Sequence, residues 1–174
     1  MQMNFKAKYS MQQVLRIGLH CIKLIRDRTQ SGLDKDGNPF KPYNNTTWFI
    51  AVSQATKRAL DLLKRENSVN FVYIGGEKFA VIKGGYANYK RAYNANNGWD
   101  GTVNLTMTGQ MLGNMTIIDK SNSSFTIGFQ SPEMAKRALR NIELGRDFLG
   151  LSPKDLDDAT LQGLLTEGIE IEMF

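Results

Sequence analysis

Two pairs of β-rich runs, each joined by a short turn, constrain the fold of this chain more than any other feature. The runs at residues 69–74 and 79–82 bracket a glycine turn, and those at 115–119 and 124–129 bracket a polar turn. Such hairpins are antiparallel, and no regular alternation of strand and helix follows that would build a parallel sheet. A further alternating run at 102–107 adds a strand. We predict an α+β fold with a small, mostly antiparallel sheet.

Helical patterns flank these strands. Ser10 and Gln13 have the spacing of a capping box, and apolar residues recur every three or four positions from there to about residue 30. A second helical pattern begins near Trp48, and two more begin after Ser131 and Ser152, each of which precedes a proline. We predict about four helices around the sheet.

A chain of 174 residues with 41% hydrophobic and 22% charged residues fits one folded domain. We predict a single domain over residues 1–174 with two candidate interaction arms. The first, at residues 32–47, is an extended loop rich in turn residues and prolines. The second, the C-terminal tail at 166–174, alternates apolar and acidic residues like an edge strand that another chain could complete.

The sequence contains few residues in patterns typical of a catalytic or metal-binding site. His20 and Cys21 are adjacent, so on a helix their side chains point about 100° apart and cannot form a nucleophile–base pair. No acid lies three or four positions from His20, where it could share a metal ion. We predict no enzyme, no metal and no cofactor. We also expect a cytoplasmic protein without membrane contact, because no signal peptide or apolar run of about 18 residues is present.

Charge is divided unevenly along the chain. Residues 1–98 contain 16 Lys and Arg against 6 Asp and Glu, whereas residues 99–174 contain 6 against 11. A basic nucleic-acid-binding domain does not predict an acidic second half, but a chain that associates with copies of itself or with two unlike partners predicts both. Chance placement of surface charges is the alternative, and it stays open.

Several bulky residues lie in loops or beside basic residues, where a partner could bind. Tyr86 and Tyr89 alternate with basic residues, a pattern that suits a nucleic-acid strand but favours protein contact. The connection at 146–151 is rich in apolar residues, so it either plugs the domain's own core or meets a partner. The residues expected to contact a partner are Phe40, Tyr43, Tyr86, Tyr89, Arg146, Phe148, Leu149, Ile169, Ile171 and Phe174.

Five segments, taken in order, carry a resemblance to a known family. They are IRDRT at 25–29, DGNPFKPY at 36–43, GGYANYK at 84–90, VNLTMTGQML at 103–112 and RDFLGLS at 146–152. In their order and spacing the chain resembles the tailed-bacteriophage virion-morphogenesis proteins of the tail-completion or head–tail joining type.

The resemblance implies a structural virion protein with neither enzymatic activity nor a cofactor. It implies a ring, most often of six copies, at the virion neck, assembled in the host cytoplasm. The implied partners are a head connector or adaptor protein, a tail terminator or tail tube protein, and genomic DNA that passes through the lumen without sequence-specific binding. The alternative is a nucleic-acid-binding module that uses the basic N-terminal half. Its cations would be Arg16, Lys23, Arg26, Arg28, Lys57, Arg58, Lys64 and Arg65.

Overall fold

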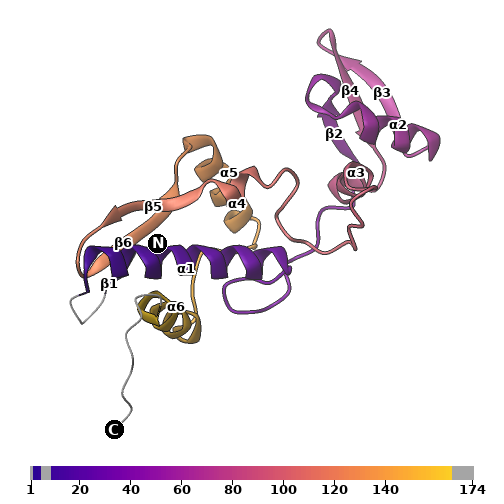
Figure 1. The fold of residues 1–174 in the computed structure, drawn as a ribbon. Helices are drawn as coiled ribbons and strands as arrows, with labels where there is room; N and C mark the ends of the chain where they lie inside the picture. The colour runs from indigo at the N-terminus through magenta and orange to yellow at the C-terminus, as the bar shows by residue number, and fades with distance from the viewer. Residues whose placement is uncertain (1, 5–8, 166–174) are drawn as a thin grey trace. The chain divides into compact units, whose positions relative to one another are not determined.

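The computed structural model describes residues 2–4 and 9–165, which separate into two compact units (Figure 1). Unit 1 comprises Met1–Lys41 and Asn104–Phe174, and unit 2 comprises Pro42–Val103. Unit 2 is therefore an insertion in the sequence of unit 1, where the sequence predicted a single domain. Each unit has its own three-stranded antiparallel sheet. The predicted α+β class is confirmed, but the strands do not join in one sheet.

Unit 1 is built around α1 (Met11–Gln30). The predicted capping box is present: Gln13 N–H donates to the Ser10 hydroxyl, and Ser10 N–H donates to the Gln13 side chain. The sheet, in the order β1 (Gln2–Asn4), β6 (Ser124–Phe129) and β5 (Met115–Lys120), packs on one side of α1, and α6 (Pro153–Leu165) packs on another (Figure 1).

Small residues let these elements approach α1 closely. A Cβ on Gly18 of α1 would lie 2.5 Å from Cδ1 of Ile117 in β5, and a Cβ on Gly163 of α6 would lie 3.0 Å from the backbone nitrogen of Ile17. Ile17 is itself fully buried, with the core side chains Val14, Cys21 and Ile25 on the same helix. The core of unit 1 therefore follows α1 from end to end.

The remaining elements of unit 1 include α4 (Gln110–Gly113) and α5 (Pro132–Glu143). The predicted β5–β6 hairpin and the helices after Ser131 and Ser152 are confirmed. The strand predicted at 102–107 is wrong, because this segment is irregular. The Asn104 side chain accepts the Thr106 N–H, and Leu105 adopts a φ of 49°. A local side-chain turn has thus replaced a strand ladder.

Unit 2 contains a sheet in the order β2 (Trp48–Ala51), β4 (Glu77–Ile82) and β3 (Val69–Ile74). Its helical elements are η1 (Val52–Gln54), α2 (Lys57–Arg65) and α3 (Gly85–Tyr93). The predicted β3–β4 hairpin is confirmed, with both glycines of its turn at positive φ. The helix predicted from Trp48 is wrong at its start: Trp48 pairs with Ile82 in a strand, and the helix begins at Lys57.

Candidate partner-binding site

The C-terminal end of α1 is held by one arginine. The Arg28 guanidinium lies 2.9 Å from Oδ2 of Asp155 on α6, and it donates to the carbonyls of Phe148 at 3.1 Å and Gly150 at 2.7 Å. The Arg28 side chain is 12% exposed. It therefore ties the connection at 146–152 to two helices from a site largely removed from water.

The turn after α1 folds back on the same connection. The Asp34 carboxylate accepts the N–H groups of Asp36 and Asn38, and the Phe40 N–H donates to the Gly32 carbonyl. The Arg146 side chain donates to the Lys41 carbonyl at 3.1 Å. This arrangement closes the loop against its own unit.

Three predicted partner residues are consequently internal. Phe40 is 6% exposed, Arg146 7% and Phe148 0%. The prediction that Phe40 docks on a neighbouring chain is wrong, because the closed turn directs its ring into unit 1. The connection at 146–151 was expected either to fill the core of its own domain or to meet a partner. Phe148 packs in the core of its own unit, and Leu149 is half-buried.

The predicted aromatic contacts of unit 2 form one cluster with each other. The ring centroids of Tyr43 and Tyr86 are 5.1 Å apart, and Trp48 lies 5.3 Å from Tyr86 and 5.4 Å from Tyr89. Lys90 is fully buried and its ammonium donates to the Tyr43 hydroxyl at 2.7 Å. Tyr89 is 1% exposed and accepts the N–H of Thr56, so it cannot serve as a contact residue. Tyr43 and Tyr86 are half-buried.

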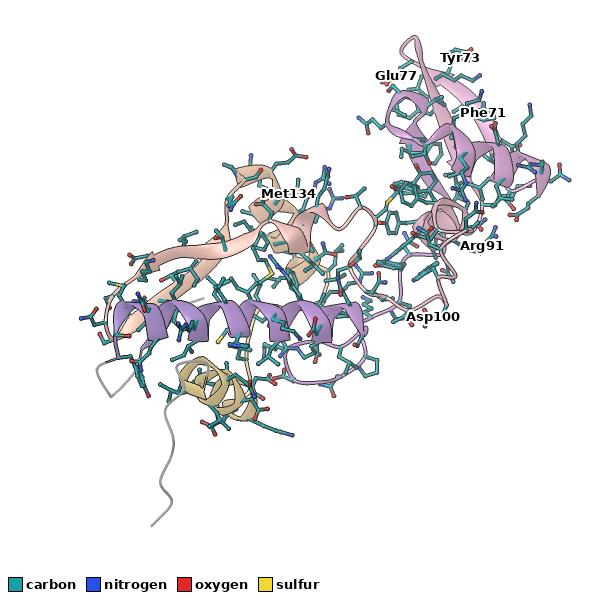
Figure 2. All side chains as sticks on the ribbon, viewed as in Figure 1. Phe71, Tyr73, Glu77, Arg91, Asp100 and Met134 are labelled. Atoms are coloured by element: carbon teal, nitrogen blue, oxygen red, sulfur yellow. The ribbon has the colours of Figure 1, made fainter. Side chains whose placement is uncertain are left out.

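The remaining predicted contacts, Ile169, Ile171 and Phe174, lie outside the described residues. The surface that sequence reasoning missed is on the β3–β4 hairpin (Figure 2). Tyr73 is 73% exposed, Ile74 55%, and Phe49 on β2 52%. Bulky residues at successive positions of β3 were the available signal, since such a strand needs cover on both faces.

Basic residues of α2 form a second exposed surface. Lys57, Arg58, Lys64 and Arg65 are all exposed, and none makes an ion pair in the described part of the chain. The first turn of α2 carries two cations and no acid. That arrangement opposes the helix dipole, so Lys57 and Arg58 do not serve the stability of α2, whereas Lys64 and Arg65 lie in its last turn, where the dipole favours positive charge.

Groups suited to catalysis are sparse in the described chain. Burial raises the pKa of the Cys21 thiol to about 12, which keeps it protonated and a poor nucleophile. No cluster of three or more potential metal ligands occurs among the described residues. A helix long and apolar enough to cross a bilayer is likewise not found in that part of the protein.

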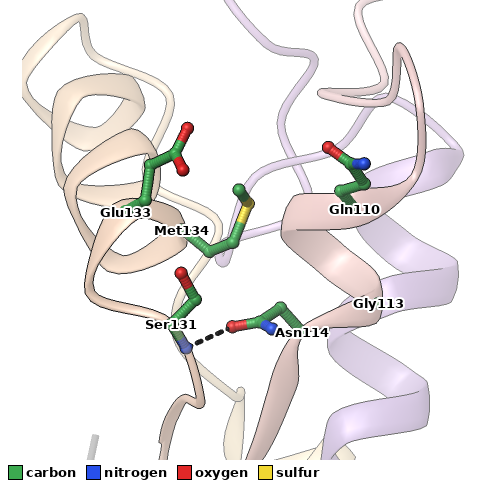
Figure 3. Close-up of a pocket in the computed structure, with 6 residues that line it drawn as sticks. All are labelled: Gln110, Gly113, Asn114, Ser131, Glu133 and Met134. Carbon is green, nitrogen blue, oxygen red and sulfur yellow. Dashed lines mark hydrogen bonds between the residues drawn. The ribbon is translucent and has the colours of Figure 1, made fainter.

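A surface pocket of about 440 Å³ lies beside α4 and the start of α5 (Figure 3). Its lining includes Asn114, whose side-chain oxygen accepts the Ser131 N–H at 2.8 Å and so fixes the start of α5. The one ionisable lining residue, Glu133, pairs with Arg137. The pocket therefore holds no acid–base pair.

Comparisons with known proteins give no match: no family model fits the chain, and neither a curated protein nor a solved structure is significantly similar to it.

Proposed function

We propose that this chain is a structural protein of the tailed-phage virion neck, of the tail-completion or head–tail joining type. It forms a ring, expected to contain six copies, between the head connector and the tail, and it works by assembly without a chemical step. Its partners are the head connector or adaptor protein and the tail terminator or tail tube protein. Genomic DNA passes through the lumen without sequence-specific contacts.

The observation that carries the proposal is that the five segments of the resemblance contact one another. Arg26, in the first segment, donates to the Leu112 carbonyl at the end of the fourth, and Arg28 donates to carbonyls of the fifth. Lys41, in the second segment, accepts from Arg146.

The third segment joins the same set through unit 2. Its Lys90 donates to Tyr43, the last residue of the second segment. Within unit 1, segments about 120 residues apart in the sequence are therefore held together by specific hydrogen bonds, and within unit 2 the third segment is held to the end of the second. These hydrogen bonds give the segments a structural role in this chain, and the proposal rests on that role together with their order and spacing.

The mass of the purified protein tests the assembly directly. Native mass spectrometry of the protein alone, and mixed with connector or tail fractions, should give a closed oligomer that binds one or both fractions. In a phage that carries the gene, deletion of residues 168–174 should leave a folded subunit, poor ring formation, and heads and tails that do not join. Infectious particles at normal yield from the deletion would place the interface elsewhere.

The exposed cations of α2 favour nucleic-acid binding as a second candidate function. Of the cations first proposed for it, Arg26 and Arg28 are engaged within unit 1, whereas the four on α2 remain exposed. Retention on DNA should then fall steeply with salt, and replacing Lys64 with alanine should reduce the slope by about one counterion. Retention that is insensitive to salt would exclude this function.

A further inference from the structure

One sheet edge in unit 2 lacks the features that keep edge strands from pairing with other chains. The edge strands of the described sheets are β1, β5, β2 and β3. β1 and β2 are only three and four residues long, and β5 has a register shift after Ile117 and ends on Asp119 and Lys120. Short length, irregularity and terminal charges are protective.

β3 has none of these protections. It is six residues long, it contains neither a charge nor a proline, and it pairs with β4 in unbroken register from Val69 to Ile74. No described strand pairs with its other edge. A long, regular and uncharged edge of this kind is suited to receive a strand from another chain.

The two faces of the sheet differ beside this edge. The face that we name the apolar face carries Val72, Ile74, Phe79 and Val81 near β3, together with Asn70. The opposite face, which we name the lysine face, carries Phe71, Tyr73 and Lys78 toward the hairpin turn and the buried Val69, Ala80 and Ile82 toward its other end. Lys78 Nζ lies 4.8 Å from the centre of the Phe71 ring, so a positive charge lies on this face within reach of the edge. Glu77 is on the apolar side, opposite Ile74.

Residues 169–174, which lie outside the described part of the chain, have a sequence that matches both faces. Ile169, Ile171 and Met173 occupy one parity, and Glu170, Glu172 and the terminal Phe174 occupy the other. In a strand placed beside β3, the apolar set would extend the apolar face, and the carboxylates would lie on the lysine face. The opposite placement would put the carboxylates on the same face as Glu77, where like charges repel.

The net charges of the two parts also favour residues 169–174 as the strand that pairs with β3. Residues 166–174 contain three acids and no base. Unit 2 contains eight Lys and Arg against four Asp and Glu. Opposite net charges speed the encounter of residues 166–174 with unit 2, and the like net charges of two copies of unit 2 disfavour pairing of β3 with the β3 of a neighbour.

We propose that residues 169–174 of one copy add as a fourth strand to the free edge of β3 in a second copy. The inference rests on the proposed function, because it supplies the contact between subunits of that ring. Each copy donates one strand and receives one, which makes the contact head to tail, as closure of a ring requires.

Charge reversal in the full-length chain tests this pairing. One variant carries Lys78→Glu, and the other carries Glu170→Lys with Glu172→Lys. At low ionic strength, sedimentation velocity should show that each variant needs about tenfold more protein than the wild type for half-assembly, because attraction becomes repulsion. Lys136→Glu is the matched control, since it makes the same change of charge at an exposed lysine of α5 in unit 1, away from the β3 edge, and it should change this concentration by less than about twofold.

Mixing the two variants distinguishes pairing between copies from pairing within one chain. In a ring that alternates the variants, every tail meets an edge of opposite charge, so an equimolar mixture should assemble near the wild-type concentration. Hydrogen exchange should show slower exchange of β3 amides in the assembled wild type than in the tail variant. Exchange in β4 should be equal in both, which verifies that the hairpin is folded.

Two results overturn the proposal and differ in what they say of the ring. If the wild type forms rings and Lys78→Glu behaves like the control, or the mixture fails to assemble, the strand pairing is wrong and the proposed function stands. If the wild type remains monomeric at every concentration and β3 amides exchange equally in both proteins, the pairing and the ring both fail.

Discussion

Replacing Arg28 with alanine should destabilise unit 1 by about 3 kcal/mol. The substitution removes one ion pair with Asp155 and two hydrogen bonds to the carbonyls of Phe148 and Gly150. A hydrogen bond that involves a charged group contributes about 1.5–3 kcal/mol, and a buried acceptor left unpaired costs about 1–3 kcal/mol. The sum is reduced because Asp155 is 26% exposed to water and retains the Ser152 N–H as a donor.

The matched control is Lys23→Ala, which removes the same charge from the same helix. Lys23 pairs with Asp27 one turn along α1, and the two side chains are 68% and 54% exposed. An exposed pair at this spacing contributes about 0.3–0.5 kcal/mol. The difference between the two variants therefore isolates what burial and the carbonyl contacts of Arg28 contribute.

Urea denaturation can be followed separately in each unit. The chain has two tryptophans, Trp48 and Trp99, and both belong to unit 2, so their fluorescence reports that unit. Far-UV circular dichroism is dominated by the longer helices of unit 1. Arg28→Ala should lower the midpoint of the dichroism transition and leave the fluorescence midpoint unchanged. A loss below about 1 kcal/mol, or one equal to that of Lys23→Ala, would refute the reasoning.

Three further predictions concern buried positions. Phe40→Ala should cost unit 1 about 3 kcal/mol in urea denaturation, because a ring that is 6% exposed leaves a cavity, and a loss within about 1 kcal/mol would restore its role as a docking residue. Gly85→Ala should lower the fluorescence midpoint of unit 2, because Gly85 has a φ of 65° and an added Cβ would meet the Thr46 carbonyl oxygen. The Cys21 thiol, whose pKa burial raises from 9.0 to about 12, should resist thiol reagents at pH 8 in the native state. Because only the unfolded chain releases this proton above pH 9, unfolding free energy should fall between pH 9 and 12, and Cys21→Ser should remove this part of the pH dependence.

The elements that sequence predicted correctly are those fixed by local signals. The Ser10 capping box, the glycine turn of the β3–β4 hairpin and the proline after Ser131 each act within a few residues. The outer strands of both sheets pair over long separations: Met3 lies opposite Phe125, and Trp48 lies opposite Ile82. These pairings decide which strands share a sheet, and hence that the chain forms two units. They could not be predicted, because no local pattern in the sequence shows which distant strand is the partner.

The helix predicted from Trp48 shows how two patterns can coincide. Trp48, Val52, Ala55 and Ala59 follow helical spacing, and the last of them does lie buried on α2. The consecutive apolar residues Trp48, Phe49 and Ile50 also suit a strand, and pairing with β4 decides between the two. Spacing alone cannot separate them, because the deciding partner lies about 30 residues away.

The candidate site was predicted less well than the fold, for a physical reason. Phe40 and Phe148 were expected at a partner because bulky apolar residues in loops must be covered by something. The sequence does not say whether that cover is the chain itself, and here Arg28 and Arg146 fix both loops against unit 1. The exposed residues of the β3–β4 hairpin were not predicted, because the pattern of apolar residues at successive positions indicates a strand but not which of its faces is covered.

The uneven charge of the sequence acquires a different meaning in the fold. The basic helix α1 and the acidic helix α6 belong to one unit, pack on each other and are joined by the Arg28–Asp155 pair. Unit 1 as a whole contains 14 Lys and Arg against 13 Asp and Glu, so the two halves of the chain do not present two opposed surfaces.

The largest net charge is the excess of four positive charges on unit 2, and the acids of unit 1 include the three carboxylates within residues 166–174. We expect the electrostatic contribution to association between copies to come from unit 2 and this acidic segment. It should be screened as salt rises from 0.01 to 0.15 M, over which the Debye length falls from about 30 Å to about 8 Å. Assembly that persists unchanged over this range would be dominated by strand pairing and the apolar face rather than by charge.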